Sequence, residues 1–229
     1  GTEERRPRQG VRRQGQGQGW LGEVPHGSRA AEDAPDWFFI DIQPQQINPF
    51  LALVDNISSD TIIEKTPMLR GRVTALNDVP ASQTDKDAES AWILRGDRAL
   101  TWQAEPPIGA TLTRGEWWPA HYKGPPLMSI TENMARDYNL AIGDSVILNI
   151  LGREITAKIA NAREVKWESF RINFVFIMTP GALDGAPHSW LATTRSPDKN
   201  FASQIEKQVT TEFNNISAVS VSDAVQTVE

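Results

Sequence analysis

Trp37-Phe38-Phe39-Ile40-Asp41-Ile42 is the stretch that decides the fold. It is a short run of aromatic and β-branched residues, which is typical of a buried β-strand. Pro44 follows, at a position suited to the start of a helix. The next apolar residues recur at the spacing of one helical face: Ile47, Phe50, Leu51 and Val54. Because Thr61–Lys65 and Met68–Leu76 then have extended character, the order of elements predicts a β-α-β unit.

A second unit of similar kind closes the chain. Ile172–Met178 and Ser189–Thr194 are predicted to be strands, and the first is expected to be a central strand of the outer unit. Ser196 is predicted to cap a helix whose first residue is Pro197. The apolar residues of that helix lie near one face: Phe201, Ile205, Val209, Phe213 and Ile216. With a last strand at Ser217–Val221, the two outer segments predict a split βαβ arrangement.

The segment between these units is predicted to contain short extended pieces, turns and one short helix. Ala91–Leu94 and Ala99–Trp102 are predicted to be extended pieces on either side of a turn. Ser129-Ile130-Thr131-Glu132 fits a capping box, which would open a short helix over Ile130–Tyr138. A hairpin is expected between Val146 and Ile159, with its turn at Gly152-Arg153.

The chain is therefore expected to have three parts. Residues 1–34 are rich in Arg, Gln and Gly and are predicted to be a disordered leader or a segment added for expression. Residues 35–76 together with 166–229 are predicted to form an α/β subdomain, and residues 77–165 an inserted, smaller, β-rich subdomain. The fold class is α+β. Residues 17–22 match G-x-G-x-x-G, but no strand precedes them and no helix pattern follows, so they predict no nucleotide site.

Composition excludes several classes of function. The net charge of −6 over 229 residues argues against a nucleic-acid-binding protein, which normally presents a basic face. The chain has no Cys, which removes disulfides, thiol catalysis and zinc–thiolate sites. Since no apolar run approaches the roughly 20 residues of a membrane helix, we expect the chain as given to be soluble.

Residues for catalysis are hard to find in this sequence. Three histidines lie far apart without the spacing of metal ligands: His26, His121 and His188. Glu164, Glu168 and Asp41 leave a carboxylate-dependent hydrolase open as an alternative, although Asp41 is expected to face solvent from its strand. No catalytic residue, metal or cofactor is predicted for the chain.

Three tryptophans are the candidate contact residues for a partner or cargo: Trp117, Trp118 and Trp167. Trp117 and Trp118 are neighbours, and neighbours on a strand face opposite sides. Either one of them is a core residue and the other packs on a loop, or one is exposed at a contact surface. Trp167 lies in the charged stretch Arg163–Phe170, where it would either seal a junction between subdomains or contribute to the same surface.

An ordered series of stretches resembles YbbP-like permeases, a group within the FtsX/MacB superfamily of ABC transporters. The stretches are Trp37–Gln43, Leu94–Arg98, Gly115–Pro119, Leu140–Ser145, Arg163–Met178 and Pro180–Gly185. The resemblance covers about residues 35–229 and is to the large extracytoplasmic domain in the second half of such a permease. Lys166 departs from it, because the family usually has Asp before the tryptophan.

This resemblance implies a MacB-like periplasmic core, in which a porter-like α/β subdomain is split by a β-rich insertion. It also implies a non-catalytic, periplasmic domain of an inner-membrane protein, joined to the membrane by flanking helices. ATP would be hydrolysed by a separate ATPase subunit, and the domain would transmit motion to hydrophobic cargo or to an envelope partner such as an esterase. A stand-alone periplasmic ligand-binding module is the main alternative.

Overall fold

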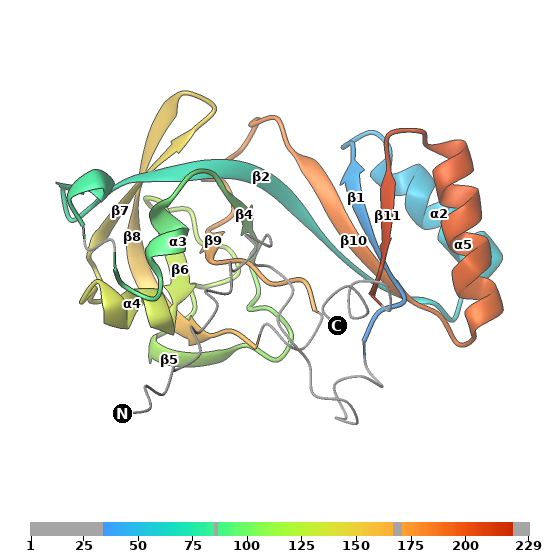
Figure 1. Ribbon diagram of the computed structural model, residues 1–229, viewed down its shortest axis with the longest axis horizontal. Helices are drawn as coiled ribbons and strands as arrows, with labels where there is room; N and C mark the ends of the chain where they lie inside the picture. Colours follow the sequence, from blue (N-terminus) through green and yellow to red (C-terminus); the bar gives the residue numbers. More distant parts are fainter. Residues whose placement is uncertain (1–33, 85–86, 167–170, 222–229) are drawn as a thin grey trace, which may run out of the picture.

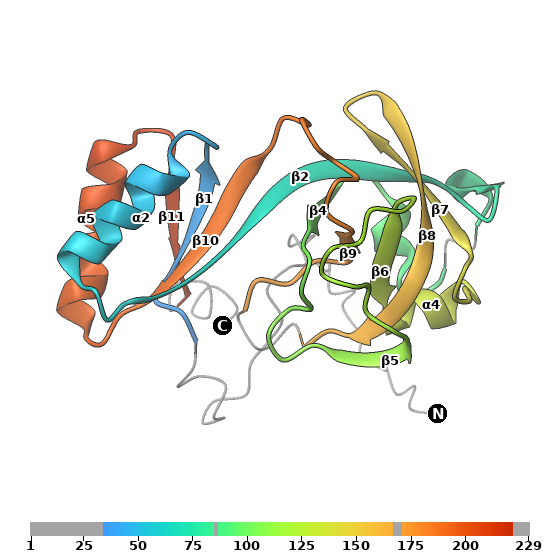
Figure 2. The same ribbon diagram turned by 180° about the vertical axis from the view of Figure 1, so that it is seen from behind.

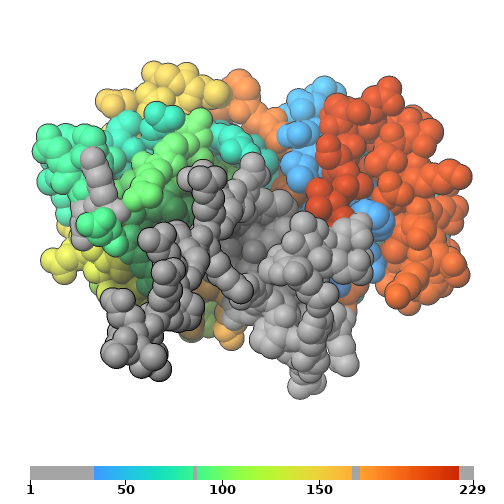
Figure 3. Space-filling view, viewed as in Figure 1, coloured from blue at the N-terminus to red at the C-terminus, as the bar shows by residue number. Residues whose placement is uncertain are grey.

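The computed structural model describes residues 34–84, 87–166 and 171–221. Two parts lie side by side in Figure 1: an open sheet covered by two helices, and a β-barrel. The long strand β2 (Ile62–Leu76) runs through both parts, as the view from behind in Figure 2 also shows. The space-filling view in Figure 3 places the helical C-terminal part and the barrel at opposite ends of the molecule.

The open sheet is antiparallel and has the order β11-β1-β10-β2. Its other strands are β1 (Trp37–Ile42), β10 (Ser189–Arg195) and β11 (Ser217–Ser220). Helix α2 (Ile47–Ile57) joins β1 to β2, and helix α5 (Lys199–Glu212) joins β10 to β11. In each unit a strand of the other unit separates the two strands, which is a split βαβ topology. A relationship to porter-like domains stays a prediction.

The barrel is a closed ring of strands. The second half of β2 pairs with β4 (Arg98–Trp102) and β7 (Ser145–Ile150), and β8 (Arg153–Glu164), β6 (Leu127–Thr131) and β9 (Phe176–Met178) complete the ring. Strand β5 (Thr111–Gly115) pairs with the last residues of β8, on the edge opposite β6. The remaining short elements are β3 (Val79–Pro80), η1 (Ala81–Gln83), α3 (Ala91–Leu94) and α4 (Glu132–Asp137).

Three apolar clusters hold these parts together. Phe39, Phe50 and Ile205 belong to the core between the open sheet and its helices, where the rings of Phe39 and Phe50 meet edge to face. A second cluster, which contains Leu100, Met128, Leu148 and Phe176, is built from the strands of the barrel. The third, which we call the junction cluster, joins the opposite face of the open sheet to the barrel: Phe38, Trp118, Phe174, Ile177, Leu191 and Val221. Burial in this cluster opposes rotation of one part against the other.

The local patterns located most elements but misplaced two helix starts. Strands β1 and β10, helix α2 and the β7–β8 hairpin confirm their predictions. Pro44 was wrong as a helix start, because α2 begins at Ile47 after Gln46. Ser196 was also wrong as a cap: the Asp198 carboxylate accepts the N–H groups of Asn200 and Phe201, 2.7 and 3.2 Å away.

Two predictions in the middle segment were wrong. Ala91–Leu94 forms the helix α3 rather than a strand. The capping box does not form, because Ser129 lies within β6 and Thr131 is the N-cap of α4. The hydroxyl of Thr131 accepts the N–H of Met134 at 3.4 Å. Neither a four-residue apolar run nor a cluster of capping residues fixes an element by itself.

Ile172–Met178 does not form a central strand of the outer unit, so this prediction was wrong. The strand in this segment is only β9, and it pairs with β4 and β6 of the barrel rather than with the outer sheet. Phe174–Met178 is buried throughout, with Phe176 in the barrel cluster and Ile177 in the junction cluster. Two parts of the barrel, β9 and the second half of β2, therefore lie outside residues 77–165, the range predicted for the inserted subdomain.

The described chain starts and stops at the same end of two neighbouring strands of the open sheet. Trp37 of β1 lies opposite Ser220 of β11, and the N–H of Val221 donates to the carbonyl of Asp36 at 3.3 Å. Over the described ranges, no helix combines the length and apolarity required to cross a bilayer.

Candidate functional site: a groove beside the tryptophan pair

Trp117 and Trp118 stand side by side directly after β5. Their ring centroids are 4.2 Å apart, with the planes tilted by 34°. The indole N–H of Trp117 donates to the carbonyl of Ala104 at 2.7 Å, and that of Trp118 donates to the carbonyl of Gln103 at 3.0 Å. Both rings therefore hold the loop that follows β4.

Gly115 allows the chain to reach this position. Its φ is +68°, and a Cβ added there would meet the carbonyl oxygen of Ala160 at 2.2 Å. Only glycine can bring the backbone this close to β8 in this conformation. The tight approach directs Trp117 and Trp118 toward the junction between the two parts.

The three predicted contact residues have different positions. Trp118 is 4% exposed and belongs to the junction cluster, so its side chain is packed as a core residue. Trp117 is half-buried beside it. Trp167 lies outside the described residues. Of the two that the structure describes, Trp117 is the one that lies where a partner could touch it.

The loop held by the tryptophans forms one wall of a groove of about 770 Å³. This volume lies within the range of sites that bind small molecules. The groove is lined by Ile63–Thr66 of β2, the Gln103–Ala110 loop, Arg163–Lys166, Arg171–Phe174 and Ile177. We refer to it as the β2 groove. Sequence patterns did not predict it, because its walls come from distant segments.

Arg163 is the most unusual charged residue of the β2 groove. It is 2% exposed, and its guanidinium donates to Ser129 Oγ at 2.9 Å and to the carbonyls of Phe174 and Val175. Burial lowers the pKa of Arg163 to about 9, so the group still carries its charge at neutral pH. No carboxylate of the described residues forms an ion pair with it, whereas Arg171 pairs with Glu64 at 3.0 Å.

The other candidate residues do not gather into one site. Asp41 is exposed at a bulge of β1, with φ +65°, as expected for a solvent-facing carboxylate. Glu164 is exposed at the β2 groove, and Glu168 lies outside the described residues. His188 packs edge-on against Trp102 and Trp190, with centroids 5.1 and 6.1 Å apart. Across the described ranges, no group of three or more His, Cys, Asp or Glu side chains could hold a metal ion.

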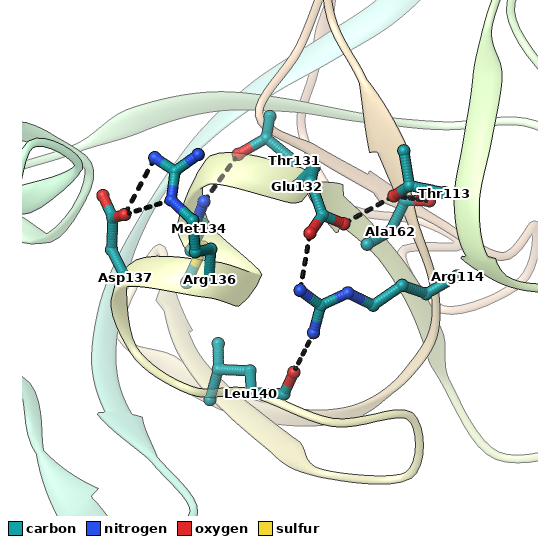
Figure 4. Close-up of polar contacts among 9 residues, drawn as sticks. All are labelled: Thr113, Arg114, Thr131, Glu132, Met134, Arg136, Asp137, Leu140 and Ala162. Atoms are coloured by element: carbon teal, nitrogen blue, oxygen red, sulfur yellow. Dashed lines mark hydrogen bonds and ion pairs between the residues drawn. The ribbon is translucent and has the colours of Figure 1, made fainter.

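A polar cluster on α4 replaces the expected capping box (Figure 4). Glu132 accepts hydrogen bonds from Thr113 Oγ1 and from Arg114, each at 2.5 Å. Arg114 also donates to the carbonyl of Leu140 at 3.3 Å. Desolvation raises the pKa of Glu132, but the bonds from Thr113 and Arg114 outweigh it, and the net result is a lowered pKa. The cluster ties β5 to α4 and is structural.

Glu132→Gln is expected to remove a pH-dependent part of the stability. A carboxyl with a lowered pKa stabilises the folded state above its unfolded value of 4.5, and this contribution is lost as the pH falls through the folded pKa. The difference in unfolding free energy between the parent and Glu132→Gln should therefore be constant near neutral pH and shrink below pH 4.5. Urea unfolding at several pH values measures it, and a difference that grows with acid would contradict the assignment.

Most of the chain is similar to a known transporter protein. No protein-family profile matches the chain. A segment of 182 residues is 34% identical to YbbP of Escherichia coli (strain K12), an ABC transporter permease that is described as uncharacterized. The chain resembles part of an ABC transporter permease. The match covers 78% of this chain, which spans about a fifth (21%) of the length of YbbP. This supports a transporter-associated role.

Proposed function

We propose that this chain is a non-catalytic periplasmic domain of an ABC transporter permease, and that it transmits ATP-driven motion of membrane helices. The similarity to YbbP over 182 residues is the observation that carries the proposal. ATP would be bound and hydrolysed by a separate cytoplasmic subunit, and this domain would need no cofactor. The porter-like and β-rich subdomains would correspond to the split sheet and the barrel.

The positions of the two described ends support this role. Asp36 and Val221 are joined by a backbone hydrogen bond of 3.3 Å, so the strands β1 and β11 leave the fold side by side. A domain held between two membrane helices would receive both of them at this end of the sheet. Displacement of either helix would then act first on the open sheet.

The junction cluster would carry that motion to the barrel. Phe38 and Leu191 of the sheet pack with Ile177 of the barrel and with Trp118. Strand β2 also continues from one part into the other without a break. Because packed interiors deform little, the two parts would move as one body. Hydrophobic cargo or an envelope partner such as an esterase would meet this body beside Trp117.

A stand-alone ligand-binding module is the second candidate, and the β2 groove favours it. Its volume of about 770 Å³ would suit a small molecule. Saturable binding of a small molecule by the isolated chain, together with an intact transporter that works without the groove, would favour the module over the permease domain.

Cysteine labelling in cells tests the proposed location. The chain has no Cys, so Arg153→Cys at the exposed hairpin introduces one thiol into the domain of the full-length permease. We expect a membrane-impermeant maleimide to label it in cells with an intact inner membrane. The permease without the substitution is the control. Labelling that requires disruption of the inner membrane would contradict a periplasmic domain.

A further inference from the structure

We propose that the β2 groove binds an extended segment of a partner protein as an added strand on the free edge of β2, at Ile63 and Lys65. The segment would be apolar and carry at least one carboxylate. The inference rests on the proposed function only in assigning the segment to a partner protein of the transporter.

The edge of β2 is open along the β2 groove. One edge pairs with β10 from Ile62 to Met68. The opposite edge pairs with β4, but only from Leu69 onward. After β4 ends at Trp102 the chain turns away, since the N–H of Gln103 donates to the carbonyl of Met178 at 3.2 Å. In the described part of the chain, no strand pairs with Ile63–Lys65 on this edge.

Two observations fix the direction of the backbone groups on this edge. The carbonyl of Thr194 accepts from the N–H of Asp36 at 2.8 Å, so the backbone groups of Thr194 point toward β1. Ile63 lies opposite Thr194 in the β10–β2 pair. In such a pair the backbone groups of both residues point away from each other, so the N–H and C=O of Ile63 point away from β10. The carbonyl of Pro67 accepts from Thr101 Oγ1 at 2.6 Å, on the side of β4. Because these groups alternate along a strand, Lys65 also presents its N–H and C=O to the β2 groove.

In the described residues, no hydrogen bond joins these groups to the wall formed by the Gln103–Ala110 loop. It contains Pro106 and Pro107, which have no backbone N–H, followed by Ile108, whose side chain is 71% exposed. Exposed strand edges are usually blunted, because they pair readily with other chains. Here the free edge lines a groove with an apolar wall, where a strand can enter.

The chemistry of the groove selects the occupant. Alternating N–H and C=O groups on a strand edge recognise another extended backbone, as in β-strand addition. Ile63, Ile172 and Phe174 give the lining an apolar character. Among the described lining residues, four cations stand against three carboxylates, a balance of +1: Lys65, Arg163, Lys166 and Arg171 against Glu64, Glu105 and Glu164. Since the buried Arg163 has no ion pair with a described residue, a carboxylate on the incoming segment complements the groove.

Selection and hydrogen exchange on the full chain test the proposal. Random octapeptides displayed on phage are selected against the 229-residue protein, and the selected peptides are synthesised. By NMR, the amides of Ile63 and Lys65 should exchange quickly in the free protein and about tenfold or more slowly with peptide bound. The amides of Glu64 and Thr66, which face β10, should be slow in both states. Selected peptides should be apolar with an acidic residue, and N-methylation of alternate residues should abolish binding.

Lys65→Pro is the decisive variant. It removes a groove-facing N–H without taking a ladder bond from β10, as Pro67 already does two residues further along the same edge. Loss of that hydrogen bond should weaken peptide binding about tenfold or more. Lys65→Arg, which keeps both the N–H and the charge, is the matched control and should bind as the parent does.

Three results would overturn the proposal. These are a library that yields no binder, peptides that bind Lys65→Pro as tightly as the parent, and protection confined to other amides. Protection of Ile63 and Lys65 in the peptide-free protein that disappears on dilution would assign the edge to a second copy of this chain instead. These measurements use the isolated chain, so their failure leaves the proposed function standing, and a failure of cysteine labelling in the permease leaves the peptide site standing.

Discussion

Trp118→Ala is expected to lower the unfolding free energy by about 3–5 kcal/mol, the usual cost of removing a large buried aromatic side chain. Trp118 is 4% exposed and packs between the open sheet and the barrel. The substitution opens a cavity in the junction cluster and leaves the carbonyl of Gln103 without its indole donor. Denaturant unfolding followed by circular dichroism measures the loss.

Trp92→Ala is the matched control for this prediction. Trp92 is 38% exposed and lies on α3, away from the junction cluster. We expect its replacement to cost about 1 kcal/mol or less. Equal losses for the two variants would mean that Trp118 does not hold the sheet and the barrel together.

Arg163→Ala is expected to cost roughly 3–4 kcal/mol, because a buried network loses its central donor. The guanidinium reaches Ser129 Oγ and the carbonyls of Phe174 and Val175, and all three acceptors would remain buried without it. The desolvation of an unpaired cation disappears at the same time, which keeps the loss below the sum of the broken bonds. Equilibrium unfolding in urea measures the effect.

Two further variants make the Arg163 prediction specific. Arg163→Lys keeps the charge but lacks the planar fork that serves three acceptors, so its loss should lie between those of the parent and the alanine variant. Arg153→Ala at the exposed hairpin should change stability by no more than about 0.5 kcal/mol. An Arg163→Ala protein as stable as the parent would show that the network contributes nothing to the barrel.

Sequence patterns predicted the elements that are determined by residues close together in the chain. The run Trp37–Ile42 needed no distant partner to be identified as a strand, and the apolar spacing of α2 identified its buried face. The β7–β8 turn is also local, since Leu151 and Gly152 both adopt positive φ. In α5 the helix was found but its start was misplaced, because Ser196 and Asp198 are both good caps on either side of a proline.

Features that depend on tertiary contacts could not be predicted. Phe174–Met178 is buried on both faces, so its periodicity did not reveal that β9 belongs to the barrel. Nothing in Ile62–Leu76 indicates that one strand serves two sheets. The burial of Trp118 and the hydrogen bonds of Arg163 depend on contacts between segments that are far apart in the sequence. The β2 groove forms where β2 extends beyond its pairing with β4.

The most direct test of the proposed motion is energy transfer in the reconstituted permease and its ATPase subunit. A donor at Arg153→Cys and acceptors on lipid headgroups report the distance from the barrel to the membrane, while a second label at Lys207→Cys on α5 reports the spacing inside the domain. We predict that ATP changes the first transfer efficiency and leaves the second unchanged, because the junction cluster holds the two parts as one body. An unchanged distance to the membrane during ATP hydrolysis would contradict transmission of motion through this domain.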